Sequence, residues 1–271
     1  MKYKLSVLLP AIRQERWVGV YDSINKAFND TLELIIISSK PLPGELLNKK
    51  NVKYIFSERS PAQKQQEGLC QAEGEWVTWM SDDSTWVPGA LDKVFESIPD
   101  VKDLGTFYVM KYLEGPEFEF PKEHQDAWGY KTNYDFMKSD AYYKCHTHNS
   151  SDFPFVPEDA PILSICLIKR LLLWKIGGYD CRFQTQAMAS DDLSIRLMNY
   201  GCKYVLLDQV VQQCGWMEQG TGDHGPLHYA QTLHDEPLLK SMYNNDSCKD
   251  RTIIPLDNWK DTPAVWKRRK G

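Results

Sequence analysis

The sequence lacks the features that define several broad classes of protein. Its seven cysteines, spread over 271 residues, form no CxxC pair and no regular spacing, which argues against a disulfide framework and is typical of a reducing compartment. No apolar run approaches the roughly 18 residues of a spanning helix. The amino-terminal stretch MKYKLSVLLPAIRQER has too short an apolar core for a signal peptide. We therefore expect a cytoplasmic protein without a transmembrane segment.

An excess of positive charge is also absent. The chain carries 32 basic and 37 acidic residues, and the resulting net charge of -5 argues against a general affinity for nucleic acid or anionic membranes. The basic cluster at residues 267–270 is an exception. We expect it to be a solvated end, with weak peripheral contact to a membrane or polyanion as the alternative.

The apolar pattern predicts an α/β protein. Continuous apolar runs at 5–9, 32–37, 52–56 and 76–80 are typical of buried parallel strands. Segments whose apolar residues recur at helical spacing follow these runs. The amino-terminal half is therefore predicted to be a doubly wound α/β layer with right-handed crossovers. The later elements predicted are strands at 106–113, 162–168 and 204–207, helices at 169–176 and from Ser190, and an amphipathic stretch at 226–243 broken at Pro237.

An acidic pair, Asp82 and Asp83, follows the strand at 76–80. Ligands collect beyond the carboxyl ends of strands in an open α/β sheet, so two carboxylates there suit a divalent cation whose natural partner is a diphosphate. An Asp-rich turn that caps the next helix is the alternative. Arg59 and Lys64, after the third strand and on the first turn of the following helix, could hold phosphate, although a solvated helix face equally explains Lys64.

A second acidic pair, Asp191 and Asp192, follows Ser190 at the expected start of a helix. Serine suits the N-cap and carboxylates on the first turn complement the helix dipole, so capping alone could explain both aspartates. Between the two pairs, residues 122–157 are aromatic and irregular, and they could form an acceptor wall or pack against the body. Cys145, His146 and His148 there lack a fourth ligand for a zinc site.

Three segments, in chain order, resemble the family 2 type glycosyltransferases of the GT-A fold, which transfer a sugar from a nucleotide diphosphate sugar to an acceptor hydroxyl. The segments are LSVLLP with LIIIS, then residues 72–91 around the first acidic pair, then IGGYD followed by SDDLSIRLMNYG. The resemblance implies one Rossmann-like domain over 1–211, with a central, mostly parallel mixed sheet flanked by helices. We expect a nucleotide-sugar half (1–105), an acceptor and catalytic half (106–211, with an insertion at 121–158), and a helical or extended carboxy-terminal extension (212–271) packing on the domain.

The resemblance also implies roles for particular residues. Asp83 matches the last aspartate of the family's DxD metal motif, and His224, with His228 behind it, is the candidate second ligand of Mn²⁺ or Mg²⁺. Asp191 or Asp192 falls where the family keeps its catalytic base, in two registers that differ by one residue. Acidic residues usual in the family are missing at Ser38, Ser81 and Ala189. The expected donor contacts are Pro10, Ser38, Arg59, Lys64, Ser81, Asp82 and Trp86.

We therefore predict a metal-dependent, inverting glycosyltransferase with a UDP-sugar as the expected donor. One alternative is a non-catalytic sugar- or nucleotide-binding protein on the same fold, which the missing acidic residues leave open. Another is a sugar-phosphate nucleotidyltransferase, which should carry a Gly-rich basic loop after the first strand, where this chain has AIRQERW. The acceptor stays open among a glycan, a protein and a modified nucleotide base, and so does the oligomeric state.

Overall fold

The structure is a computed structural model that describes residues 2–98, 104–115, 131–132, 161, 163, 165–215, 222–243 and 250–269. Cys145, His146 and His148 lie outside the described residues, as does the predicted acceptor wall at 122–157 apart from a two-residue strand. Within the described ranges, no helix has both the length and the apolar character that crossing a bilayer requires.

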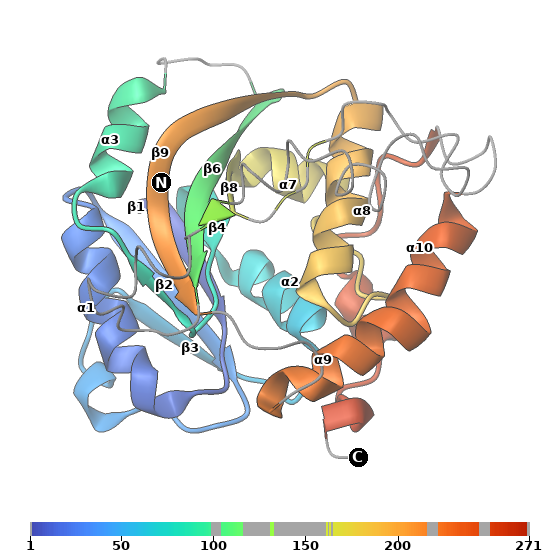
Figure 1. Cartoon of the computed structure of the whole chain (residues 1–271), viewed down its shortest axis with the longest axis horizontal. Helices are drawn as coiled ribbons and strands as arrows, with labels where there is room; N and C mark the ends of the chain where they lie inside the picture. The colour runs from blue at the N-terminus through green and yellow to red at the C-terminus, as the bar shows by residue number, and fades with distance from the viewer. Residues whose placement is uncertain are drawn as a thin grey trace.

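One mixed sheet forms the centre of the molecule (Figure 1). Its amino-terminal half is parallel, in the spatial order β3-β2-β1-β4, and it continues as β8-β6-β9-β5, with β7 paired to β6. β8 runs antiparallel to both β4 and β6, whereas β9 runs parallel to β6. The strands are β1 Tyr3–Pro10, β2 Leu32–Ser38, β3 Val52–Phe56, β4 Gly74–Trp79, β5 Ser84–Trp86, β6 Thr106–Gly115, β7 Lys131–Thr132, β8 Cys166–Lys169 and β9 Lys203–Gly215.

Helices cover both faces of this sheet (Figure 1). Successive side chains of a strand point to opposite faces, and the apolar runs are therefore divided between two cores. Leu8 and Ile35 pack toward α2, α7 and α8, whereas Val7 and Ile36 pack toward α1 and α3. The α-helices are α1 Trp17–Ala27, α2 Pro61–Gln71, α3 Ala90–Ser97, α7 Arg170–Ile176, α8 Gln186–Asn199, α9 Gly225–Ala230 and α10 Glu236–Met242.

The predicted mixed α/β sheet flanked by helices is confirmed, but three of the predicted elements are wrong in detail. α8 begins at Gln186 and not at Ser190, because Thr185 is the N-cap and its side chain accepts a hydrogen bond from Met188 N. β9 extends to Gly215, so the domain boundary predicted at 211 falls inside a strand. The predicted break at Pro237 does not occur. Pro237 lies in the first turn of α10, where a missing N–H costs nothing, and a π-helix, Gln231–Asp235, joins α9 to α10.

The carboxy-terminal segment, residues 250–269, has little regular structure and runs back across the domain. The described part of this segment ends in a 3-10 helix, Lys267–Arg269 (η7), which contacts α9. The other 3-10 helices among the described residues are Gln14–Arg16, Gly44–Leu46, Gly222–His224 (η3) and Asn258–Asp261 (Figure 1).

Candidate active site

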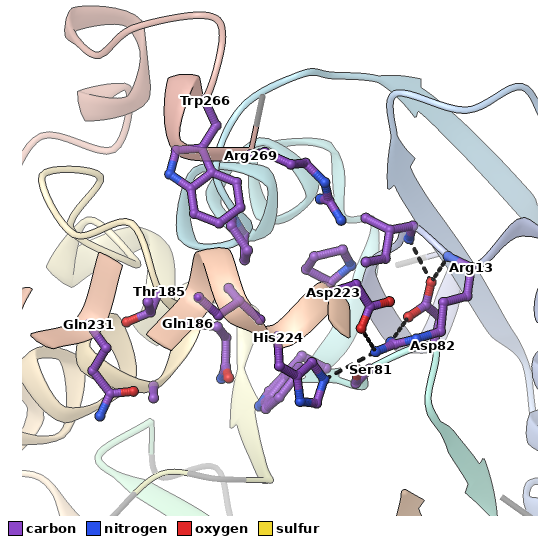
Figure 2. A pocket seen from close by; sticks show the side chains of 16 residues that line it. Arg13, Ser81, Asp82, Thr185, Gln186, Asp223, His224, Gln231, Trp266 and Arg269 are labelled. Atoms are coloured by element: carbon purple, nitrogen blue, oxygen red, sulfur yellow. Dashed lines mark hydrogen bonds and ion pairs between the residues drawn. The ribbon is translucent and has the colours of Figure 1, made fainter. Parts of the chain in front are cut away.

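A cavity opens where β1 and β4 end, as the position of the first acidic pair predicts. The two strands are parallel neighbours, so their carboxyl ends meet at the same edge of the sheet. Pro10 and Arg13 line the cavity from β1 and the turn after it, and Ser81 and Asp82 line it from the turn after β4 (Figure 2). The wall opposite is formed by the start of α8 and by the end of the carboxy-terminal segment.

The guanidinium of Arg13 lies at the centre of the acidic residues of this cavity (Figure 2). Its Nη1 donates to Asp82 Oδ1 at 2.7 Å and lies 3.5 Å from Asp83 Oδ2. Its Nη2 donates to Asp223 Oδ1 at 3.0 Å and lies 3.1 Å from His224 Nε2. One cation therefore gathers side chains from the turn after β4 and from η3, where Asp82 and Asp223 are 69 and 210 residues away from Arg13 in the sequence.

Both carboxylate oxygens of Asp82 already accept hydrogen bonds from within the protein. Its side chain is 2% exposed, and its Oδ2 accepts hydrogen bonds from the backbone N–H groups of Ile12 at 2.6 Å and Arg13 at 2.5 Å. Trp17 Nε1 lies 3.3 Å from the same oxygen. Asp82 thus fixes the turn after β1. The other two carboxylates beside Arg13 are Asp223, which lines the cavity, and Asp83, which does not.

Asp83 stays ionised despite its burial. Desolvation raises the pKa of this carboxyl, but His224, Arg13 and Ser81 together outweigh that effect and hold the pKa below its ordinary value. A carboxylate that is charged at neutral pH can act as a ligand for a cation.

The predicted metal ligands, Asp83 and His224, lie close together. Asp83 Oδ2 and His224 Nε2 are 3.5 Å apart, a separation that suits two neighbouring ligands of one ion with bonds of about 2.1 Å. No group of three or more His, Cys, Asp or Glu side chains surrounds a common metal position in the described part of the chain. An ion held by these two residues would need water and phosphate oxygens to complete its shell, and it would have to displace Arg13, whose Nη2 lies 3.1 Å from His224 Nε2. His228, the second candidate, does not line the cavity.

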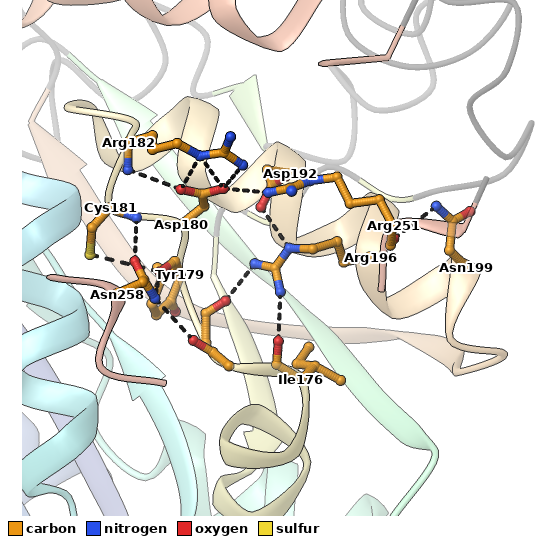
Figure 3. Close-up of polar contacts among 12 residues, drawn as sticks. Ile176, Tyr179, Asp180, Cys181, Arg182, Asp192, Arg196, Asn199, Arg251 and Asn258 are labelled. Atoms are coloured by element: carbon orange, nitrogen blue, oxygen red, sulfur yellow. Dashed lines mark hydrogen bonds and ion pairs between the residues drawn. The ribbon is translucent and has the colours of Figure 1, made fainter. Parts of the chain in front are cut away.

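The two aspartates of the second acidic pair both lie on α8 but point in different directions. Asp192 is fully buried, and its carboxylate accepts hydrogen bonds from Arg196 Nε at 2.7 Å and Arg251 Nε at 3.1 Å (Figure 3). It also accepts one from Tyr243 Oη at 2.7 Å. Asp191 is buried as well, and neither aspartate lines the cavity. Asp191 does follow Ala187, a lining residue, by four positions, so the two lie on one face of the helix.

The other expected donor contacts fall into two groups. Pro10, Ser81 and Asp82 line the cavity, whereas Ser38, Arg59, Lys64 and Trp86 do not. Trp86 is buried in the core on β5, where its Nε1 faces Met80 Sδ at 2.9 Å. Arg59 donates to backbone carbonyls of the carboxy-terminal segment. The role of each of these residues as a donor contact stays a prediction.

Several lining residues were not predicted from the sequence. Arg13 lies in the loop AIRQERW, Gln186 lies at the start of α8, and Trp266 and Arg269 belong to the end expected to be solvated. The available signal was Trp266, since a large apolar ring within a basic stretch indicates that part of that stretch is packed. A second cavity adjoins the first and shares Ile12, Arg13, Asp223 and Arg269 with it; Glu15, Ser39 and Lys40 complete its lining.

Comparison with known proteins identifies the fold. No protein-family model matches the chain, and no curated protein sequence matches it. Among solved structures, S. aureus TarS 1-349 superposes with a TM-score of 0.54 at 14% identity, covering 94% of this chain and 71% of that one. The UDP complex of TarS 1-349 superposes with a TM-score of 0.53 at 15% identity, covering 89% of this chain and 69% of that one. The UDP-GlcNAc complex superposes with a TM-score of 0.53 at 16% identity, covering 91% of this chain and 69% of that one. The chain therefore has the GT-A fold of family 2 glycosyltransferases.

Proposed function

We propose that the chain is a glycosyltransferase that moves a sugar from a nucleotide diphosphate sugar to an acceptor hydroxyl. The observation that carries this proposal is the cavity at the carboxyl ends of β1 and β4, which Arg13 and His224 line, with Asp83 Oδ2 3.5 Å from each of them just outside the lining. Ligands of open α/β sheets bind at this edge. The bound UDP and UDP-GlcNAc in structures of S. aureus TarS support a nucleotide-sugar donor on this fold.

The two adjoining cavities suit the parts of such a donor. The second cavity, with Ser39 and Lys40 beyond the end of β2, would take the nucleoside. The residues common to both cavities would lie beside the diphosphate. The first cavity, with Trp79 and Gln186, would take the sugar, since aromatic rings pack against sugar rings and amides bind hydroxyls. A UDP-sugar is the donor we expect.

Asp83 and His224 are the residues that would hold a divalent ion, Mn²⁺ or Mg²⁺. When bound, such an ion supplies positive charge that stabilises the departing diphosphate. Arg13 contributes in a different way, because its guanidinium helps to hold the pKa of Asp83 below its ordinary value and forms an ion pair with Asp223.

Asp191 is the residue on α8 that we propose as the catalytic base. Asp192 has its carboxylate oxygens occupied by Arg196, Arg251 and Tyr243, and so it has no capacity for an acceptor hydroxyl. Asp191 takes part in an interaction of its own, and it shares a helix face with Ala187 at the cavity wall. A base that takes the proton of the hydroxyl on the side opposite the diphosphate gives in-line attack and inversion at the anomeric carbon. Retention of configuration, seen by NMR of the product, would contradict this.

A non-catalytic nucleotide-sugar-binding protein is the second candidate, and one observation favours it. The side chain that α8 presents to the cavity is an amide: Gln186 lines it and donates to Ser190 Oγ at 2.9 Å. A binding protein needs polar contacts there but no base. Turnover therefore separates the two candidates.

The deciding experiment measures donor hydrolysis and thermal stability together. For the wild-type protein we expect UDP with Mn²⁺ to raise the melting temperature by more than the sum of the two separate effects, because the ion needs phosphate oxygens to complete its shell. Asp83→Asn should lower the rate of sugar release about 100-fold while the protein stays folded. Hydrolysis of no donor among UDP-, GDP- and dTDP-sugars would favour the binding protein, and wild-type turnover by Asp83→Asn would exclude Asp83 as a ligand.

A further inference from the structure

We infer that the carboxy-terminal segment, residues 250–269, is part of the donor site, and that Arg269 binds the donor's diphosphate with Lys64 behind it. This inference rests on the proposed function, because it assigns contacts for the same donor. It replaces the expectation that the basic end of the chain is solvated.

Arg59 holds the segment against the domain near the cavity. Its Nη1 donates to the carbonyl oxygens of Trp259 at 3.0 Å, Thr262 at 2.8 Å and Pro263 at 3.2 Å. Its Nε donates to Glu67 on α2 at 3.1 Å. A planar guanidinium with several fixed partners holds the backbone in one geometry.

The earlier part of the segment is also tied to the domain. Gln66 Nε2 donates to the carbonyl of Leu256 at 2.7 Å, and Ile254 N donates to the carbonyl of Ile176 at 3.1 Å. Gly177 permits this approach, since a Cβ there would collide with the backbone oxygen of Ile254. Residues 250–269 are therefore bound to the domain at both ends of the segment.

Trp266 directs the last residues of the segment toward the cavity. Its backbone N–H donates to the carbonyl of Glu58 at 2.8 Å, and its Nε1 donates to Gln184 Oε1 at 2.8 Å. The ring is 6% exposed and lines the cavity. Arg268 also donates to Gln184 Oε1, so neighbouring side chains of η7 are fixed beside α8.

Arg269 and Lys64 are two cations whose charge has no direct partner among the described residues, and Lys40 in the second cavity is another. Arg269 lines both cavities, and apart from a ring contact with Trp266 its guanidinium has no hydrogen bond or ion pair with a described residue. Lys64, on α2, is 2% exposed, and its ammonium has no such partner among the described residues either. Arg13, in contrast, is already paired with Asp82 and Asp223.

The electrostatics of this pair favour an anion. Burial, with repulsion from Arg269 as the next cause, lowers the pKa of Lys64 to about 8, although Asp82, Glu67 and Glu58 act in the opposite direction. A diphosphate placed beside Arg269 would relieve that repulsion and accept hydrogen bonds from the guanidinium. Arg269 is one of the four residues that line both cavities, with Ile12, Arg13 and Asp223, so a donor spanning both would carry its phosphates past it.

Calorimetric titration of the full chain with UDP, with inorganic pyrophosphate and with uridine tests this inference. Arg269→Gln should weaken UDP and pyrophosphate binding about tenfold or more, the usual cost of losing a charge-assisted hydrogen bond, and should leave uridine binding unchanged. Arg269→Lys, which keeps the charge, should restore part of the affinity. Lys267→Gln is the matched control, since it removes the same charge from an exposed neighbour in η7 and should bind UDP as the wild type does.

The outcomes separate this inference from the proposed function. If the wild type binds UDP and Arg269→Gln binds it equally well, the segment is not part of the donor site and the proposed function stands. The same conclusion follows if Lys267→Gln weakens UDP binding as much as Arg269→Gln, because the effect is then general charge. If the wild type binds neither pyrophosphate nor any of UDP, GDP and dTDP, the proposed function and this inference fail together.

Discussion

Two clusters of arginine and aspartate, similar in composition, differ in what they can do. Around Arg196 both partners are sealed: Arg196 and Asp192 have 0% exposed side chains, and the other guanidinium nitrogens donate to the carbonyls of Ile176 and Gly178 (Figure 3). Around Arg13 the cluster is open: the guanidinium is 12% exposed and Asp223 is 37% exposed, and the cluster forms a cavity wall (Figure 2). A cluster that satisfies itself stabilises the fold, whereas one that faces a cavity can exchange partners with a ligand.

The sealed cluster should show the largest effect on stability. Asp192→Asn leaves the charge of Arg196 buried without its carboxylate, and we expect the free energy of unfolding to fall by about 3–5 kcal/mol in urea titrations. Asp191→Asn is the matched control one position away. It should lose less stability than Asp192→Asn but lower the transfer rate about 100-fold or more, as loss of a general base does. Wild-type transfer by Asp191→Asn would remove the base from α8 altogether.

Lys64, a buried cation outside both clusters, makes the opposite prediction, in which stability and binding separate. Lys64→Met replaces an unpaired buried cation by an apolar side chain of similar length, so the free energy of unfolding should rise by about 1 kcal/mol without ligand. The rise in melting temperature that UDP causes should be smaller than in the wild type, because one positive charge beside the diphosphate is lost. Lys267→Met, at an exposed position, should change neither quantity. An unchanged response to UDP in Lys64→Met would separate Lys64 from the donor site.

The smallest expected effect is on the loss of stability at low pH, and it concerns Asp180, which pairs with Arg251 beside the sealed cluster. Burial raises the pKa of Asp180, but Arg182 and Arg251 outweigh it, so the folded-state pKa lies below the ordinary value. A depressed carboxyl pKa contributes stability above the unfolded-state pKa of about 4, and that contribution is lost as the pH falls through the folded-state pKa. Melting temperatures between pH 6 and pH 3 should therefore fall less steeply for Asp180→Asn than for the wild type. Parallel curves would show that Asp180 is not a source of the acid sensitivity.

The sheet was largely predictable because buried strands and amphipathic helices have different periods. The runs at 5–9, 32–37 and 52–56 appear as β1, β2 and β3 with small changes at their ends. The start of α8 was not predictable in this way. Ser190 has the chemistry of an N-cap, but Thr185 fills that role, and its backbone N–H and hydroxyl are themselves held by Asp235, which is 50 residues away. Local preference was overruled by a contact that only folding creates.

The candidate site shows the same limit. The position of Asp83 was predictable because an acidic residue shortly after a buried strand lies at the edge of the sheet where ligands bind, while its role as a metal ligand stays a prediction. Arg13 was not, because AIRQERW has no pattern that shows which of its arginines turns toward a carboxylate. Arg59 was predicted near the site for its charge, yet its guanidinium binds backbone carbonyls of the carboxy-terminal segment.

By itself, the sequence determined the order of strands and helices, the two-sided core and the place of the first acidic pair, because each follows from periodicity and strand direction. Tertiary structure alone decided which charges are satisfied. It paired Asp192 with Arg196 and Arg251, surrounded Arg13 with carboxylates, and brought Arg269 back across the domain to the cavity. Hydrogen bonds between residues far apart in the sequence produce no periodic pattern in it. Which charged side chains pair with one another and which face a ligand is therefore decided only when the chain folds.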